Sequence, residues 1–333
     1  MCANVDNDRN YLLDNLKGIL IFLVVFGHSL EVYKDKSIII QSIYMFIYLF
    51  HMPVFIFVSG YFSKDVDKCR SKAFRNFFVP YLIFNIIWNL VSIPVVGAEN
   101  FSITTPGWAL WYLMSMFFWR ISLKDLIKVK YIFSISFVVG ITAGLSNDFD
   151  TFLSLSRTLF FLPFFLGGYY TSEKKLLSFK KGNYLLSMSI IIVTMIIAIM
   201  LAYLEVFPTE FLYGSHAYNT FSITLWLAIL GRMSVYVIGF AFVYVMINLI
   251  TPTKTFFSKI GLNTFSVYIL HPYLVAVVFA INSFIPDVFI QVIICIVTSI
   301  LITYLLSRNI VMKNFTNTIN WFVSRFEHKP NEV

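Results

Sequence analysis

Apolar residues occur in long runs along this chain, and short polar or basic segments separate the runs. Ten runs predict helices, at 12–33, 38–63, 77–96, 107–119, 131–146, 152–170, 183–204, 221–250, 261–282 and 287–307. A helix of about 20 residues crosses the hydrocarbon core of a bilayer, so most runs have the length of a span. The fourth run is short for a full crossing, and the eighth is long enough to be tilted or broken. The pattern predicts an all-α polytopic membrane protein with about ten transmembrane helices.

Composition supports this fold class and excludes others. The chain has 333 residues, of which 59% are hydrophobic and 13% charged, whereas soluble domains carry about 25% charged residues. We therefore expect the lipid bilayer to be the partner of most of the surface. The net charge of +8 does not indicate a nucleic-acid partner, because the basic residues form short clusters between apolar runs. The three cysteines are too scattered to predict a disulfide framework or a metal site.

The basic residues are concentrated in alternate loops. The clusters lie at 64–75, 120–130, 174–181 and 254–259, and both termini are also basic. The opposite loops hold only Lys34 and Lys36. By the positive-inside rule, both termini are predicted to be cytoplasmic. We expect one membrane domain over 1–310 and a cytoplasmic tail over 311–333, whose mixture of aromatic and polar residues suits a helix lying on the membrane.

Four ionisable residues share one face of the first predicted helix. Lys17 and His28 are eleven residues apart, about three helical turns, and Asp14 and Glu31 extend the stripe by three residues at each end. A histidine with a carboxylate one turn away has the parts of a general base held in one tautomer. Two alternatives stay open here: Lys17 as an ordinary anchor at the helix end, and His28 as a hydrogen-bonding partner of a neighbouring helix.

Two arginines lie inside apolar runs, where a charge needs compensation. Arg157 is near the outer end of its run, where snorkelling to the membrane surface is easy. Arg232 lies deeper and is the stronger candidate for a polar cavity. Pairing with a backbone carbonyl is the alternative for both residues.

Five segments together resemble a known family. "YLLDNLKGILIFLVVFGHSLE" (11–31) is similar to the opening helix of the integral-membrane acyltransferase family three, the O-acetyltransferases of bacterial cell-surface polysaccharides, and in particular to the branch of fucose 4-O-acetylases. The other four segments follow in the family's order: "FHMPVFIFVSGYF" (50–62), "KCRSKAFRNFFVPY" (68–81), "WALWYLMSMF" (108–117) and "LNTFSVYILHPYL" (262–274). The chain departs from the family at Lys17, where most members have an arginine, because a lysine cannot form a bidentate fork.

The resemblance implies an enzyme in the bacterial cytoplasmic membrane. The implied reaction moves an acetyl group from cytosolic acetyl-CoA to a hydroxyl of a cell-surface polysaccharide or lipid-linked sugar, without a metal. His28 is then the general base or the acetyl-accepting nucleophile, Glu31 orients it, and Lys17 belongs to the same machinery. The main alternative is a transporter or flippase of lipid-linked sugars, although the two halves of the chain show no repeat.

The resemblance also suggests how the substrates are bound. Arg70, Lys72 and Arg75 are expected to bind the phosphates of acetyl-CoA, and anchoring to lipid headgroups is the alternative for this cluster. Further residues are expected to line the passage of the substrates: Asp14, His51, Trp108, Trp111, Arg232 and His271. For the two histidines of this set, a hydrogen bond between helices is the alternative.

Overall fold

The computed structural model describes residues 9–97, 101–147 and 149–325, and these residues form helices and loops without a strand. Each predicted run contains one helix: α1 (Tyr11–Leu30), α2 (Ile38–Tyr61), α4 (Val79–Val96), α5 (Trp111–Leu126), α6 (Ile132–Thr142), α7 (Leu155–Tyr170), α9 (Tyr184–Leu204), α10 (Leu225–Leu249), α12 (Thr264–Asn282) and α13 (Val288–Leu306). Among the described residues, eight helices are long and apolar enough to cross a membrane, whereas α5 and α6 are shorter. The predicted all-α membrane fold is confirmed.

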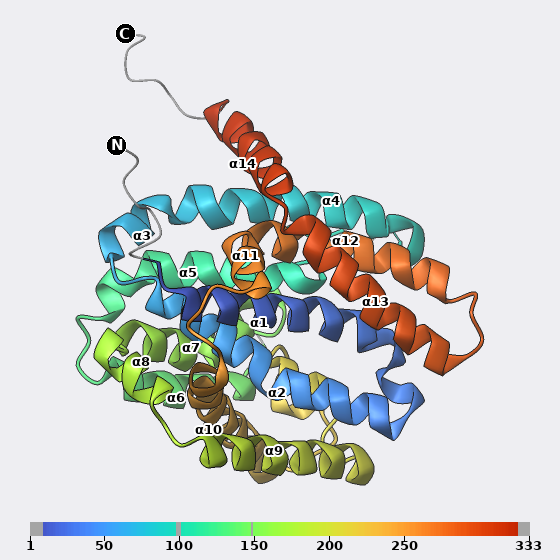
Figure 1. The fold of residues 1–333 in the computed structure, drawn as a ribbon, viewed down its shortest axis with the longest axis horizontal. Coiled ribbons are helices and arrows are strands. Elements are labelled where there is room, and N and C mark those ends of the chain that lie inside the picture. The colour runs from blue at the N-terminus through green and yellow to red at the C-terminus, as the bar shows by residue number, and fades with distance from the viewer. Residues whose placement is uncertain (1–8, 98–100, 148, 326–333) are drawn as a thin grey trace.

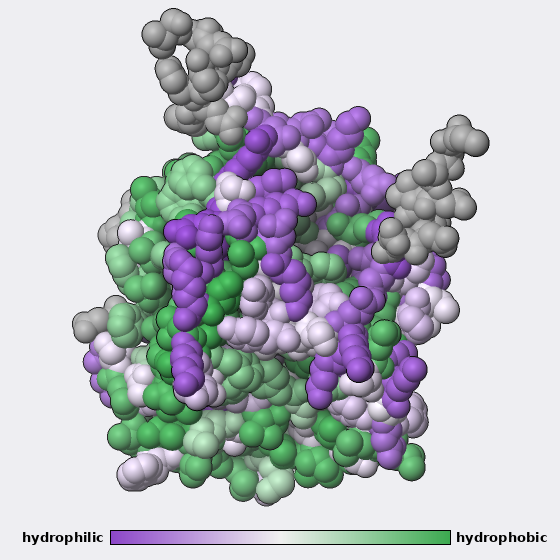
Figure 2. All heavy atoms as spheres, turned by 90° about the vertical axis from the view of Figure 1, so that its left-hand side faces the viewer, coloured by the Kyte–Doolittle hydropathy of each residue, from purple (hydrophilic) through white to green (hydrophobic). Residues whose placement is uncertain are grey.

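The long helices run broadly along the long axis of the molecule, and four shorter helices accompany them (Figure 1). The shorter helices are α3 (Val66–Ala73), α8 (Glu173–Lys180), α11 (Phe256–Leu262) and α14 (Asn309–Ser324). The start of α1 lies at the same end of the bundle as α3 and α8. Figure 2 views this end and shows hydrophilic side chains gathered over it. We call it the basic face, because it carries Lys64, Arg70, Lys124, Lys128 and Lys180; the other end is the opposite face.

Helix α1 lies in the middle of the bundle, where several helices pack against it. The side chain of Asn10 caps its first turn by accepting a hydrogen bond from the backbone N–H of Leu13 at 3.2 Å. Leucine, isoleucine and valine occur on several sides of the helix, so α2, α11, α12 and α13 can all pack around it. The helix ends at Leu30, and a short 3₁₀ helix, η1 (Glu31–Lys36), continues the chain.

Two glycines allow α2 and α7 to cross in backbone contact. A Cβ atom on Gly60 would lie 1.9 Å from the carbonyl oxygen of Phe165, and one on Gly168 would lie 1.9 Å from that of Phe57. Small residues let helices in a membrane approach this closely, and the gain is van der Waals packing. The crossing fixes the helix that carries His51 against the helix that carries Arg157.

Helix α14 covers the end of α4 with one apolar side. Phe315, Ile319 and Val323 are buried, and the Phe315 ring stacks on Phe84 of α4 with the centroids 5.5 Å apart. Trp321 is exposed on the other side. The predicted tail is thus helical up to Ser324, while its last residues, 326–333, lie outside the described part of the chain. That this helix rests on a membrane stays a prediction.

Candidate active site

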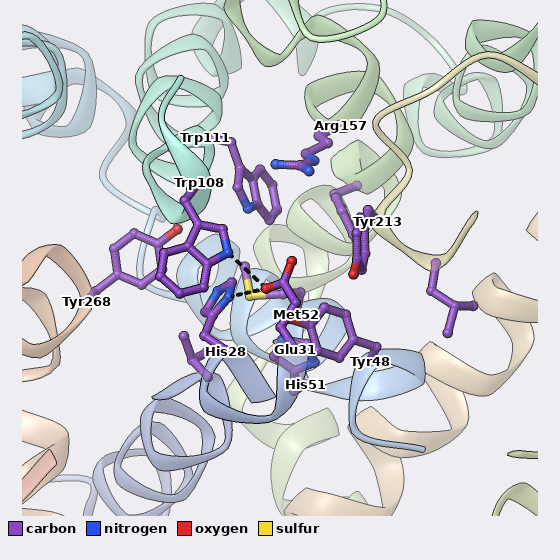
Figure 3. A pocket seen from close by; sticks show the side chains of 13 residues that line it. His28, Glu31, Tyr48, His51, Met52, Trp108, Trp111, Arg157, Tyr213 and Tyr268 are labelled. Atoms are coloured by element: carbon purple, nitrogen blue, oxygen red, sulfur yellow. Dashed lines mark hydrogen bonds and ion pairs between the residues drawn. The ribbon is translucent and has the colours of Figure 1, made fainter. Parts of the chain in front are cut away.

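A cavity opens between α1, α2, α5, α7 and α12 in the half of the bundle near the opposite face (Figure 3). We call it the His28 cavity. Its polar and aromatic lining comes from His28, Glu31, Tyr48, His51, Trp108, Trp111, Arg157, Tyr213 and Tyr268. Two residues of the predicted stripe on the first helix, His28 and Glu31, therefore line the same cavity. It also brings together three other residues expected from the sequence, His51, Trp108 and Trp111.

The carboxylate of Glu31 joins His28 to Trp108. Nδ1 of His28 lies 3.2 Å from Oε2 of Glu31, and the indole Nε1 of Trp108 donates to the same oxygen at 2.8 Å. An ionised carboxylate accepts hydrogen bonds and cannot donate them, so the neutral His28 imidazole has its proton on Nδ1 and its lone pair on Nε2. Figure 3 shows the carboxylate pointing into the space between Trp108, Arg157 and Tyr213. The arrangement presents one basic nitrogen in a polar cavity.

The other two histidines near this cavity bond to the backbone of their own helices. Nδ1 of His51 is 2.8 Å from the carbonyl oxygen of Ile47, and Nδ1 of His271 is 2.8 Å from that of Tyr268. The His271 ring lies beside His28, with the ring centroids 5.3 Å apart, and its Nε2 is buried without a hydrogen-bond partner among the described residues. Within the described part of the chain, neither histidine forms a side-chain hydrogen bond to another helix, the alternative that the sequence left open.

The two intramembrane arginines exchange the environments that the sequence predicts for them. Arg232 donates from Nη1 to the carbonyl of Gly140 and from Nη2 to that of His216, both at 3.0 Å, and it lines none of the cavities described here. It therefore ties α10 to helix α6 and to the loop that carries His216. Arg157, expected to snorkel, instead lies in the His28 cavity with its guanidinium 5.1 Å from the Trp111 ring centroid. It makes no hydrogen bond or ion pair to a described residue.

A second cavity, of about 150 Å3, lies toward the basic face. Lys17 and Arg120 line it together with Ser59, Tyr112 and Tyr268. Tyr268 also lines the His28 cavity, so this residue belongs to both walls, and its hydroxyl donates to the carbonyl oxygen of Ala109. We call this space the donor cavity.

The predicted stripe is thus shared between the two cavities. Asp14 does not line either of them, but its carboxylate pairs with Lys17 at 2.9 Å and with Arg9 at 2.8 Å. Arg120 was read from the sequence as one member of a basic loop cluster, although its Nε is buried without a partner among the described residues. Its position at the end of an apolar run gives no sign that it turns inward.

The three basic residues predicted to bind phosphates lie at the basic face outside both cavities. Arg70 pairs with Asp125 at 2.9 Å on the surface, and Lys72 is exposed. Arg75 donates to the side chain of Asn320 in α14 at 3.0 Å. None of the three lines either cavity, and Arg75 lines a separate hollow that shares Phe77 and Phe265 with the donor cavity.

Tyr213 reaches the His28 cavity from the short helix η7 (Thr209–Tyr213) at the opposite face. Its hydroxyl is 2.5 Å from that of Tyr44 and accepts from Lys34 at 3.5 Å. Burial raises the pKa of Tyr213 well above its ordinary value, so the phenol stays protonated. Lys34 also pairs with Glu210. Burial would raise the pKa of the Glu210 carboxyl, but the hydrogen bond and the charge of Lys34 have the larger effect together, so the pKa is lowered. The Lys34–Glu210 pair thus joins η1 to η7, the short helix that carries Tyr213.

Comparison with known proteins agrees with the motifs. The model of a family described as an acyltransferase domain matches residues 10–308. Nodulation protein NolL of Sinorhizobium fredii is 33% identical over 137 residues, which cover 35% of this chain and 37% of that protein. Nodulation protein NolL of Mesorhizobium japonicum is 32% identical over 113 residues, 31% of this chain and 30% of that protein. The matches thus span about a third of the length of these relatives, and no solved structure matches.

Proposed function

The chain belongs to the acyltransferase family whose model covers residues 10–308, and from this premise we propose that it is a membrane O-acetyltransferase. The proposed reaction moves the acetyl group of acetyl-CoA to a hydroxyl of a cell-surface polysaccharide or lipid-linked sugar. We place the protein in the bacterial cytoplasmic membrane with its basic face toward the cytoplasm, as the positive-inside rule requires. The acceptor then meets the opposite face.

The observation that carries this proposal is the pairing of His28 with Glu31 inside the cavity. Transfer from a thioester to a sugar needs a base that removes the hydroxyl proton as the oxygen attacks the acetyl carbon. Nε2 of His28 is available for this step because Nδ1 faces the carboxylate. Glu31 stabilises the imidazolium that results, and the C–S bond breaks to release the thiol, which takes up the proton. If the acetyl group first moves to the histidine, the same nitrogen receives it.

We propose that the donor enters through the donor cavity. Coenzyme A carries several phosphates, and Lys17 and Arg120 place two positive charges at the cavity on the cytoplasmic side. Arg70, Lys72 and Arg75 add positive charge around its entrance and attract the phosphates from solution. The thioester then has to pass Tyr268 to reach His28, because this ring lines both cavities. The donor and acceptor therefore approach His28 from opposite sides.

The test is transfer of radiolabelled acetyl groups from acetyl-CoA by purified protein in lipid nanodiscs, with a panel of lipid-linked and polymeric sugars as acceptors. We expect acetylated sugar with the wild type and a loss of about 100- to 10,000-fold with His28→Gln, the usual contribution of a general base. Thermal unfolding of both proteins in the same nanodiscs checks that the variant is folded. Full activity of the variant would remove His28 from the mechanism. Sugar crossing the bilayer without acetylation would instead identify a transporter.

A further inference from the structure

A third cavity adjoins the His28 cavity on the side of the opposite face, and we call it the outer chamber. It has a volume of about 140 Å3 and is lined by Pro106, Trp108, Asp150, Thr151, Ser154, Arg157 and Ser215. Trp108 and Arg157 line both spaces, so the outer chamber shares a wall with the site of His28. A group bound in it lies next to the proposed base, on the side away from the donor cavity.

Two polar groups of the outer chamber lack a protein partner. Ser215 is 2% exposed, and its Oγ is buried without a hydrogen bond to any described residue. Nε of Arg157 is also buried without a hydrogen-bond partner among the described residues, and the guanidinium forms no ion pair with them. Buried polar groups in folded proteins are nearly always hydrogen-bonded. The outer chamber therefore contains a guanidinium and a hydroxyl that can form hydrogen bonds to a ligand.

The loop that carries Ser215 is held firmly, so its unpaired hydroxyl is not a result of a loose segment. Ser156 of α7 donates to the carbonyl of Gly214 at 2.8 Å, and Arg232 of α10 donates to the carbonyl of His216 at 3.0 Å. These bonds fix the residues on both sides of Ser215. Arg232 thus positions the chamber wall without lining it.

The charges of the outer chamber favour a neutral ligand that both donates and accepts hydrogen bonds. Arg157 disfavours a cation, while the carboxylate of Asp150, which lies 2.6 Å from Nδ1 of His216, disfavours an anion. Thr151, Ser154 and Ser215 add hydroxyls, each of which is donor and acceptor, and Trp108 adds an aromatic surface for an apolar ring face. A sugar ring without ionised substituents offers this combination of groups.

We propose that the outer chamber is the acceptor subsite and that it binds one neutral sugar unit. Arg157 and Ser215 bond to ring hydroxyls, and the sugar packs against Trp108, which lines both spaces, so that the hydroxyl to be acetylated points past this ring toward Nε2 of His28. Arg157 acts here as a binding residue that determines specificity for the acceptor. This inference rests on the proposed O-acetyltransferase activity, since it assigns the second substrate of that reaction.

The test compares Arg157→Gln and Ser215→Ala with the wild type, using methyl glucoside and methyl galactoside as neutral probes and methyl glucuronide as the anionic probe. We expect the KM for the neutral glycosides to rise about 10- to 100-fold in the arginine variant, because a hydrogen bond to a charged group is lost, and about tenfold or less in the serine variant. The KM for acetyl-CoA should stay within about twofold. The matched controls are Arg308→Gln, at an exposed position just after α13, and Ser234→Ala, at an exposed position of α10.

Calorimetric binding of methyl glucoside in the absence of acetyl-CoA keeps the two proposals separate. Binding that is weakened by Ser215→Ala but not by Ser234→Ala supports the subsite even if the wild type transfers no acetyl group, an outcome that would overturn only the proposed reaction. Acetyl transfer with unchanged acceptor KM in both chamber variants overturns the subsite and leaves the reaction standing. A preference for methyl glucuronide over the neutral glycosides overturns the assignment of a neutral sugar.

Discussion

Oε2 of Glu31 lies 3.2 Å from Nδ1 of His28, one residue beyond the end of helix α1. The carboxylate thus reaches back to the imidazole from the first residue of a 3₁₀ turn, and Trp108 holds it in place from another segment. Residues that orient a reactive histidine in this way determine its tautomer and the basicity of its free nitrogen.

Glu31→Gln should therefore lower kcat about 10- to 100-fold with little change in either KM, because the amide cannot stabilise an imidazolium as a carboxylate does. Trp108→Phe, which keeps an aromatic ring and removes the N–H donor, should show a smaller loss of the same kind. Steady-state kinetics in nanodiscs measure both effects, and Glu173→Gln on the exposed surface of α8 is the matched control. An unchanged kcat in Glu31→Gln would show that the carboxylate only packs against the ring.

Donor binding should depend on the charges in the donor cavity more than on those outside it. We expect Lys17→Gln and Arg120→Gln each to raise the KM for acetyl-CoA about tenfold, and Lys17→Arg to stay close to the wild type, because the charge is kept. Arg70→Gln removes an exposed charge outside the cavity, which salt screens, so it should raise the KM less and only at low salt. The reverse order would place the phosphates of the donor outside the cavity.

Arg232 should prove important for stability and unimportant for the chemical step. Replacing it by methionine removes two hydrogen bonds from a charged group to the carbonyls of Gly140 and His216, which corresponds to about 2–3 kcal/mol of unfolding free energy. We expect a lower thermal midpoint and a raised acceptor KM, with kcat at saturating acceptor within about threefold of the wild type. A large loss of kcat in a variant of normal stability would instead indicate that Arg232 lines the substrate passage.

The crossing of α2 and α7 offers a test of packing with a control one residue away. An added methyl at Gly168 meets the backbone of Phe57 at 1.9 Å, whereas at Gly167 it meets only the ring edge of Phe240 at 2.8 Å. A ring can shift but two helix backbones must separate, so Gly168→Ala should lower the thermal midpoint by several degrees more than Gly167→Ala. Equal midpoints would mean that the helices are less tightly packed than the structure has them.

Much of the fold could be predicted from the sequence, because hydropathy alone marks each apolar run and every run contains a helix. The contact between His28 and Glu31 was also predictable, since a spacing of three residues is local and survives the change from α-helix to 3₁₀ helix. The sequence could not distinguish Arg157 from Arg232. Both interrupt apolar runs, and only the folded chain brings the carbonyls of Gly140 and His216 to one of them.

The same limit applies to the residues that enter the cavities from elsewhere in the chain. Arg120 has the sequence context of a membrane anchor, and Ser215 that of an ordinary loop serine. Each becomes notable only because its polar atom is buried without a partner among the described residues. Burial of that kind is a property of tertiary packing, and no periodicity along the chain encodes it.

The position of Tyr268 between two cavities has an electrical consequence. A bundle that holds three histidines and several arginines inside a membrane would conduct protons if water filled it from one face to the other. Tyr268 lies on the walls of both cavities, and its hydroxyl donates a hydrogen bond to the carbonyl oxygen of Ala109. An apolar constriction excludes water. The proposed passage of an acetyl group past Tyr268 is therefore compatible with an intact ion gradient across the membrane.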